Sequence, residues 1–280
     1  MSKSIEELTL KALFAARRRF LELGEDGKEQ IQKENRFDET TLRADWESEE
    51  AVINVFRQEK IPITIVSEEH GKVQISKTQK YTAVLDGIDG TRAYTRNNGG
   101  YYGTMVGVFK GVNPSYGDYL CSGVMEHSTG SLFFAEKGKK AHLDNREKEF
   151  FLLRCNQTTR LDERIKIFID SYWEFNRKTF SERLVGFNVP EFKLSSTDSY
   201  LRLLLGEADL VLECTRKGNL EIATAYGLIT EAGGVMVTAD GEDLGKQRYF
   251  EYGQREEEFL PVITAATKEL ALGLIEYLKK

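Results

Sequence analysis

The sequence predicts a layered α/β fold, in which a half with a mixed β-sheet is followed by a half of alternating strands and helices. Within residues 61–136, short apolar and β-branched runs are separated by turn residues, as in the strands of one sheet. Beyond residue 165, strand-like and helix-like runs alternate. The charged, irregular stretch 140–164 lies between these two patterns. We therefore expect two units: an N-terminal α+β half at 1–145 and a C-terminal α/β half at 146–280.

Two helices are expected before the first strand. The first covers residues 4–23, where Ser4 is a suitable N-cap and Gly24 a suitable stop. Its apolar residues follow helical spacing; they are Leu10, Leu13, Phe14 and Leu21. The second helix covers residues 43–58.

The remaining expected elements follow the turn residues. In the first half, strands are expected at 61–66, 81–85, 102–109, 120–125 and 132–136. In the second half, strands are expected at 165–170, 210–213 and 262–265, and helices at 173–184, 199–205, 220–232 and the C-terminus.

Composition excludes several classes of protein. The 280 residues are 40% hydrophobic and 30% charged, with a formal net charge of −6, which argues against a surface that coats nucleic acid and against a polybasic membrane anchor. No apolar run reaches the roughly 20 residues that cross a bilayer, and the first residues do not read as a signal peptide. Cys121, Cys155 and Cys214 lie far apart, so we expect neither disulfides nor a cysteine zinc site, and a reduced, cytoplasmic protein.

The most informative segment is Asp86-Gly87-Ile88-Asp89-Gly90-Thr91, which follows a predicted strand. Two carboxylates with a main-chain carbonyl between them supply the hard oxygen ligands that Mg²⁺ prefers. The amides of Gly90 and Thr91 suit a phosphate where a short helix begins. A plain surface turn is the alternative, because Asp and Gly are common in turns.

Two further segments place acids at element ends. Glu68 and Glu69 follow a predicted strand, although an exposed loop would have the same composition. Asn219 is a plausible N-cap that puts Glu221 in the first turn of a helix. There, favourable interaction with the helix dipole alone would account for an acid.

Together these segments resemble the inositol monophosphatase family, which are Mg²⁺-dependent, lithium-sensitive phosphatases related to fructose-1,6-bisphosphatase. The resemblance covers residues 40–270. The family's Asp-Pro-Ile-Asp-Gly-Thr motif reads here as residues 86–91, and its Glu-Glu as 68–69. Its Trp-Asp pair, Ala-rich helix and Glu-Ala-Gly-Gly read as 220–221 and 231–234.

Weaker matches agree with this order. Asp45 and Glu49 match an Asp-x-x-x-Glu helix of the family. The stretches 194–196 and 206–209, with Glu213, resemble its substrate-side segment.

Two departures concern the metal ligands. Gly87 replaces the motif proline, which should loosen a loop at an entropic cost of about 1 kcal/mol. Leu220-Glu221 replaces Trp-Asp, and the stretch from Glu213 to Glu221 is one residue longer than in inositol monophosphatases. Relatives of fructose-1,6-bisphosphatase use glutamate at the comparable ligand.

The resemblance implies a fold of α-β-α-β-α layers of the sugar-phosphatase type and two or three Mg²⁺ ions. It gives the metal ligands as Glu68, Asp86, the Ile88 carbonyl, Asp89 and Glu221, with Asp86 bridging two ions. It implies catalytic roles for Glu68, Asp45 and Thr91, the last two orienting a metal-activated water. It gives the substrate contacts as Asp89, Gly90, Thr91, Arg92, Ser195, Ser196 and Glu213.

The expected function is Mg²⁺-dependent hydrolysis of a small phosphorylated alcohol, similar to inositol-1-phosphate. Alternatives are a histidinol-phosphate, fructose-1,6-bisphosphate or nucleotide-3′-phosphate phosphatase. Arg92 resembles a basic residue of the histidinol-phosphate and nucleotide-3′-phosphate enzymes, although a solvated loop residue is the alternative for it. A non-catalytic regulator that binds sugar phosphates is a further alternative. We expect a homodimer, no nucleic-acid polymer and no membrane as partners, and surface or turn positions for His70, His127 and His142.

Overall fold

The computed structural model describes residues 3–34, 40–97, 99–145, 149–187, 189, 195–255 and 257–280. The helices are α1 (Ile5–Leu23), α2 (Arg43–Gln58), α3 (Thr91–Arg96), α4 (Glu174–Thr179), α5 (Ser196–Leu204), α6 (Leu220–Glu231) and α7 (Lys268–Leu278). The strands of the first half are β1 (Gln30–Glu34), β2 (Thr40–Leu42), β3 (Ile63–Ser67), β4 (Gly71–Gln74), β5 (Tyr81–Asp89), β6 (Gly103–Lys110), β7 (Tyr119–Glu126), β8 (Leu132–Glu136), β9 (His142–Asp144) and β10 (Phe150–Leu152). Those of the second half are β11 (Ile167–Ile169), β12 (Leu210–Cys214), β13 (Val235–Thr238) and β14 (Pro261–Ala265).

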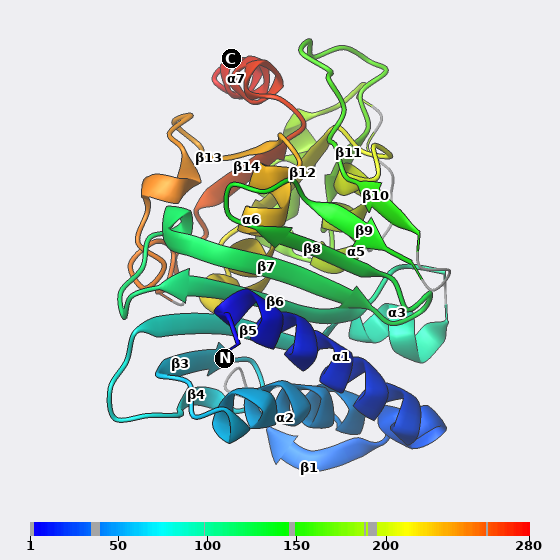
Figure 1. Cartoon of the computed structure of the whole chain (residues 1–280). Coiled ribbons are helices and arrows are strands. Elements are labelled where there is room, and N and C mark those ends of the chain that lie inside the picture. The colour runs from blue at the N-terminus through cyan, green and yellow to red at the C-terminus, as the bar shows by residue number, and fades with distance from the viewer. Residues whose placement is uncertain are drawn as a thin grey trace.

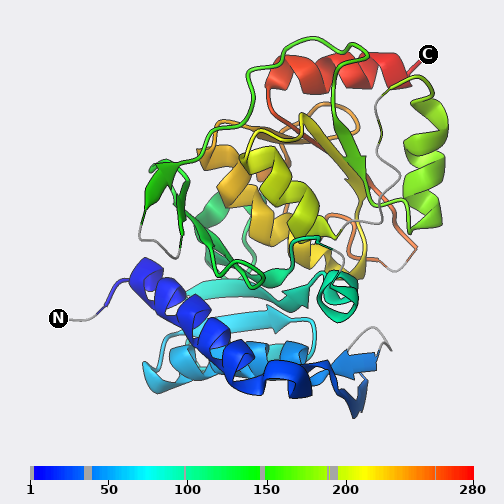
Figure 2. The same ribbon diagram turned by 90° about the vertical axis from the view of Figure 1, so that its right-hand side faces the viewer.

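The elements form five layers (Figures 1 and 2). Helices α1 and α2 cover one face of an eight-stranded sheet, and α5 and α6 lie between its other face and a four-stranded sheet. Helix α7 packs on the outer face of the smaller sheet. The α-β-α-β-α order expected from the family resemblance is therefore confirmed.

Both sheets are mixed. The larger has the order β10-β9-β8-β7-β6-β5-β3-β4, in which only the pair β3 and β5 is parallel. The smaller has the order β11-β12-β14-β13, in which only β11 and β12 are parallel. Strand pairing passes from one sheet to the other between Leu152 and Ile167. The two-unit division at residue 145 stays a prediction.

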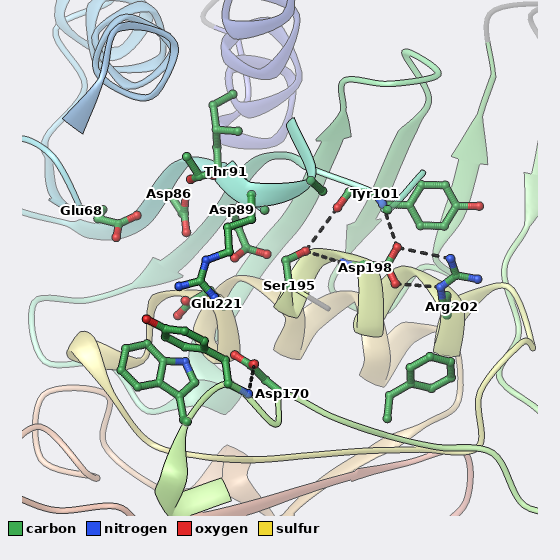
Figure 3. A pocket seen from close by; sticks show the side chains of 18 of the residues that line it. Glu68, Asp86, Asp89, Thr91, Tyr101, Asp170, Ser195, Asp198, Arg202 and Glu221 are labelled. Atoms are coloured by element: carbon green, nitrogen blue, oxygen red, sulfur yellow. Dashed lines mark hydrogen bonds and ion pairs between the residues drawn. The ribbon is translucent and has the colours of Figure 1, made fainter. Parts of the chain in front are cut away.

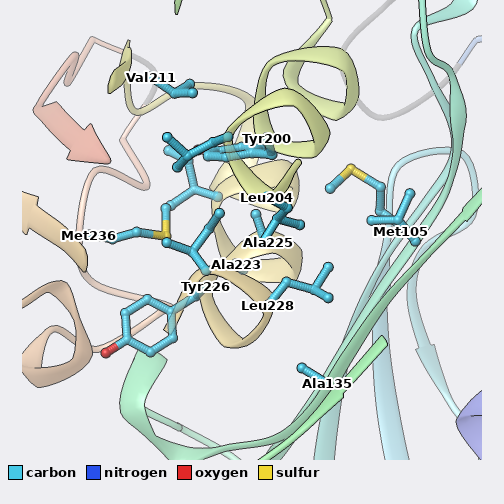
Figure 4. Packing of buried hydrophobic residues seen from close by; sticks show 14 of the residues in the cluster. Met105, Ala135, Tyr200, Leu204, Val211, Ala223, Ala225, Tyr226, Leu228 and Met236 are labelled. Carbon is cyan, nitrogen blue, oxygen red and sulfur yellow. The ribbon is translucent and has the colours of Figure 1, made fainter. Parts of the chain in front are cut away.

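Helix α6 is the centre of the molecule, because it is buried between the two sheets. Figure 4 shows its small residues Ala223 and Ala225 among side chains from both sides, including Met105 of β6 and Met236 of β13. At Gly227 a Cβ atom would lie 2.7 Å from the Tyr119 ring, so only glycine allows this approach of helix and sheet. The tight packing fixes the first turn of α6, which carries Glu221.

The expected helix at 173–184 is wrong in extent. Helix α4 ends at Thr179, and a 3₁₀ turn at Ser181–Arg183 follows. The side chain of Phe180, at the junction, is fully buried in the outer core, which turns the chain inward there. Several short strands were not expected from the sequence; they are β1, β2, β4, β9, β10 and β13.

The histidines are less exposed than expected. His127 lies in a turn, as expected, but it is only 2% exposed and its ring stacks on Phe20 at 4.3 Å. Burial lowers its pKa well below the usual value. In the described parts of the chain, no helix combines the length and apolar character needed to cross a membrane.

Candidate active site

Three carboxylates from two elements converge in one cavity. Asp86 and Asp89 lie at the end of β5, and Glu221 lies in the first turn of α6. Each offers an oxygen atom within 4.8 Å of the other two. Figure 3 shows Asp86 and Asp89 on one side and Glu221 opposite them. We call Asp86, Asp89 and Glu221 the three-carboxylate cluster.

Burial and mutual repulsion govern the ionisation of this cluster. Asp86 is 2% exposed, and burial together with the charges of Glu68, Asp89 and Glu221 raises its pKa well above the usual value. Burial and the Glu221 charge raise the pKa of Asp89 to about 6, although the Thr197 amide donates a hydrogen bond to it. The Oδ1 atom of Asp86 is buried without a hydrogen-bond partner. An oxygen left in that state marks a position for a cation.

Glu68 reaches the same cavity from the turn after β3. Glu49 of α2, which is fully buried, holds this turn. Its carboxylate accepts the backbone N–H groups of Glu68 at 3.0 Å and Glu69 at 3.1 Å, and it lies 2.9 Å from Nδ1 of His70. The Glu-Glu segment is therefore positioned by the acid that the sequence matched to the Asp-x-x-x-Glu helix.

Of Asp45 and Thr91, the two residues expected to orient a water, only Thr91 lines the cavity. Its hydroxyl donates to the Ile88 carbonyl at 3.1 Å. Asp45 is 6% exposed and is not among the lining residues. Its pKa is raised well above the usual value, first by burial and then by Glu69 and Glu68.

Gly87 has a different role from the one expected. It lies inside the irregular end of β5 and not in a loop, and its carbonyl accepts a hydrogen bond from the Thr104 hydroxyl at 2.7 Å. A Cβ atom at this position would overlap the backbone oxygen of Asp45 and lie 2.9 Å from Cγ of Glu49. Glycine is therefore required for α2 to pack this close to the metal-ligand strand.

Arg216 adds a positive charge to the acidic cavity. Its Nη1 atom lies 3.0 Å from Oε1 of Glu221. Neighbouring Glu213 is buried, accepts a hydrogen bond from the Tyr200 hydroxyl, and has its pKa raised to about 7, chiefly by burial. Asn219 takes the N-cap position of α6 as expected, but its side chain accepts from the Arg216 backbone instead of capping the helix.

The cavity has a volume of about 600 Å³, the size of a small-molecule site. The guanidinium of Arg92 stacks on the ring of Tyr172 at 3.6 Å, and Arg216 lies over Trp173 at 5.2 Å. The two rings meet edge to face at 5.1 Å. One wall is thus aromatic and basic, and through Arg216 it contacts the acid Glu221.

Helix α5 forms another wall. Ser195 caps this helix and donates to the Tyr101 carbonyl at 3.2 Å. Asp198 accepts the Tyr101 N–H at 2.7 Å and pairs with Arg202 at 2.7 Å. These contacts, visible in Figure 3, fasten α5 to the loop that follows α3.

A family model described as the inositol monophosphatase family matches residues 3–277. The chain belongs to the inositol monophosphatase family. The resemblance expected from the sequence motifs is confirmed, and it extends beyond residues 40–270.

One curated relative of this inositol monophosphatase family chain is named as a nucleotidase. The chain is 26% identical over 189 residues to "Probable 3'(2'),5'-bisphosphate nucleotidase 4" of Arabidopsis thaliana, a match that covers 64% of this chain. The match covers 54% of the relative, so the chain spans about half the length of this curated protein.

Several solved structures have the same fold as this chain. The extragenic suppressor protein suhB from Bartonella henselae superposes with a TM-score of 0.75 at 16% identity over 98% of each chain. Inositol monophosphatase from Anabaena (Nostoc) gives 0.71 at 17% identity, covering 98% of this chain and 94% of that one. Fructose-1,6-bisphosphatase from Leishmania major gives 0.70 at 14% identity, with the same two coverages.

Most site residues expected from the sequence line the cavity; they are Glu68, Asp86, Ile88, Asp89, Gly90, Thr91, Arg92, Ser195 and Glu221. Ser196 and Glu213 do not line the cavity. They are connected to it by hydrogen bonds, because Arg216 donates to the Ser196 hydroxyl at 3.4 Å and that hydroxyl donates to Glu213 at 3.4 Å. Leu194 lies outside the described residues. Sequence reasoning missed Asp170, Tyr172, Trp173, Asp198, Arg202 and Arg216. Arg216 lies in the stretch from Glu213 to Glu221 that was expected to be one residue longer than in inositol monophosphatases, and that expectation was the available sequence signal.

Proposed function

We propose that this chain is a divalent-metal-dependent phosphomonoesterase that acts on a small phosphorylated alcohol, similar to inositol-1-phosphate, in the cavity of the three-carboxylate cluster. The observation that carries the proposal is the cluster itself, with the buried, unpartnered Oδ1 of Asp86. Family membership supports it, because the family is named for its phosphatase activity.

The residues present fit Mg²⁺, since the ligand atoms are all oxygens and their charges repel one another without a cation. We propose two or three ions. Glu68, Asp86 and the Ile88 carbonyl would hold one, and Asp86, Asp89 and Glu221 a second. When bound, such cations supply Lewis acidity toward the phosphoryl group and an attacking water.

The other residues bind and orient. The Gly90 and Thr91 amides at the start of α3 would hold the phosphate, next to Arg92. The Thr91 hydroxyl and the Asp45 carboxyl would orient the attacking water. In support, Thr91 lines the cavity, and Asp45 lies near enough to Asp86 for its charge to raise the pKa there.

One observation favours a second candidate substrate, a nucleoside phosphate with two phosphate groups. The exposed ring of Tyr172 in the cavity wall offers an aromatic surface for a base, and Arg92 beside it offers a site for a second phosphate. The Arabidopsis relative is named as a nucleotidase for such bisphosphates.

A substrate panel tests the function. Inositol-1-phosphate, fructose-1,6-bisphosphate, histidinol phosphate and adenosine-3′,5′-bisphosphate are each incubated with Mg²⁺ or with excess chelator. We expect phosphate release from at least one substrate with Mg²⁺, and none in chelator. Full activity in chelator, or a phosphorylated enzyme intermediate, would overturn the proposal. Binding without any hydrolysis would favour a non-catalytic regulator.

We also propose a homodimer in the cytoplasm. The dimer is supported by the apolar side chains of Phe150, Phe151 and Leu152, which are exposed on the edge strand β10. The cytoplasmic location is supported by the three cysteines, which are free and buried.

A further inference from the structure

Arg216 is the cavity arginine that contacts the candidate metal ligands. Among the described lining residues the arginines are Arg92, Arg202 and Arg216, and of these only Arg216 pairs with the three-carboxylate cluster. Its side chain is 11% exposed, and its Nη1 lies 3.0 Å from Oε1 of Glu221. A positive charge therefore already occupies one side of the site proposed for cations.

The guanidinium is held from several directions. The Trp173 ring lies 5.2 Å away, and Nη2 donates to the Ser196 hydroxyl at 3.4 Å. The backbone N–H donates to the Asn219 side chain at 2.9 Å, which fixes the turn that carries the residue. Its Nε atom is buried and has no hydrogen-bond partner. Arg216 is thus part of the cavity wall and not a solvated side chain.

The acids around Arg216 keep it charged. Glu221, Glu213, Asp170 and Asp89 all act on the guanidinium, and together they raise its already high pKa. The positive charge of Arg216 therefore offsets part of the negative charge on the Glu221 side of the cavity.

We propose that Arg216 is a built-in cation that competes with the second divalent ion for Glu221 and thereby weakens the binding of that ion. The inference rests on the proposed function, because it concerns the same metal ligands. The Oε1 atom of Glu221 faces the guanidinium, and an ion bound to the same carboxylate would be repelled by that second positive centre at a few ångströms. Ion binding at Glu221 is therefore favoured when the guanidinium moves away from that carboxylate.

The structure offers a place for the released guanidinium. The Ser196 hydroxyl lies 3.4 Å from both Nη2 of Arg216 and Oε2 of Glu213. Glu213 is a buried carboxylate outside the three-carboxylate cluster toward which the side chain can turn. Arg216 lies between the two acids in the sequence, and the charges of both act on its guanidinium.

Calorimetric titration with Mn²⁺ on the metal-free full-length protein tests the inference. The variants are Arg216→Gln, Arg216→Met, which keeps an apolar stem on Trp173, and Arg216→Lys, which keeps the charge. Arg92→Gln is the matched control, because it removes an equal charge from the same cavity without touching the cluster. We expect the second Mn²⁺ to bind at least tenfold more tightly to the Gln and Met variants, and less than threefold differently to the Lys variant and the control.

A second measurement starts from Mn²⁺-loaded protein, so that it can be made even if a neutral variant does not fold without metal. Mn²⁺-loaded protein is dialysed to low free Mn²⁺, and the bound ions are counted by mass spectrometry. The neutral variants should retain two ions per chain at a concentration where the parent retains one. If both neutral variants bind the second ion as weakly as the parent or more weakly, the inference about Arg216 is wrong and the proposed function is unaffected. If the parent binds no Mn²⁺, the proposed function itself is wrong.

Discussion

Replacing Asp89 with asparagine should stabilise the metal-free protein at neutral pH, although it removes a candidate metal ligand. The pKa of Asp89 is raised to about 6 in the folded protein, against an ordinary 3.8. The folded state therefore binds more protons than the unfolded state between about pH 4 and pH 6, so the free energy of unfolding falls as pH rises through that window. Above it, the carboxylate costs about 3 kcal/mol.

Asparagine removes this cost and keeps an oxygen for the Thr197 amide, at a loss of about 1 kcal/mol for the weaker hydrogen bond. We therefore expect Asp89→Asn to unfold with about 2 kcal/mol more free energy than the parent at pH 7–8 in chelator, and with no advantage at pH 4. The assay is urea unfolding across this pH range, with and without Mg²⁺.

With Mg²⁺ the order should reverse, because the parent gains binding energy that the variant lacks. Asp162→Asn is the control. That carboxyl is exposed and paired with Arg164, which holds its pKa below the usual value, so its variant should gain nothing at high pH. An Asp89→Asn protein no more stable than the parent at pH 8 in chelator would refute the reasoning.

Three other predictions follow from the site. Glu221→Asp shortens the side chain by one carbon–carbon bond and withdraws its carboxylate by about 1.5 Å. It should therefore raise the Mg²⁺ concentration for half-maximal activity. An unchanged Mg²⁺ titration would show that the position of the Glu221 carboxylate does not matter for metal binding. Lithium at tens of millimolar should inhibit hydrolysis, but more weakly than is usual in the family, with Na⁺ as control; complete indifference would remove the prediction. Gly87→Ala should cost about 1–3 kcal/mol in urea unfolding because its Cβ atom overlaps Asp45. Gly273→Ala in α7, which meets no atom closer than 4.0 Å, should be neutral or stabilising, and equal effects of the two would contradict the packing argument.

The sequence alone predicted a helix correctly where the helical spacing of apolar residues is bounded by capping and stop residues close by. Helix α1 begins and ends where predicted because Ser4 forms a capping box with Glu7 and Gly24 follows the last turn. Glu221 lies in the first turn of α6 as predicted. The order of the carboxylate motifs was also enough to identify the family, because each follows a recognisable strand or begins a helix.

Elements and contacts that depend on distant partners were not predictable in this way. Strand β10 forms only by pairing with β9, and its side chains are exposed, so no alternating pattern marks it. His127 is buried because Phe20, more than one hundred residues away, stacks on it.

Helix α4 and Arg216 illustrate the same limit. The side chain of Asn176 donates to the Asp170 carbonyl and accepts the Cys214 N–H, which ties the short α4 to two strands and not to a longer helix. The Arg216–Glu221 ion pair forms across the 3₁₀ turn Lys217–Asn219, and the number of residues between the two side chains did not predict the shape of that turn.

Phosphate release by the parent and by Asp86→Asn, each with and without Mg²⁺, tests whether the three-carboxylate cluster carries a metal-dependent reaction. Asp86 is the buried acid that we propose as a ligand of both ions, so we expect the parent to be active only with Mg²⁺. We expect Asp86→Asn to lose at least about a thousandfold in turnover, roughly 4 kcal/mol of transition-state stabilisation. The variant should remain folded, and in chelator it should unfold with more free energy than the parent, because one member of a repelling cluster is gone. A folded Asp86→Asn protein within tenfold of the parent's turnover would contradict the claim that this cluster carries the reaction.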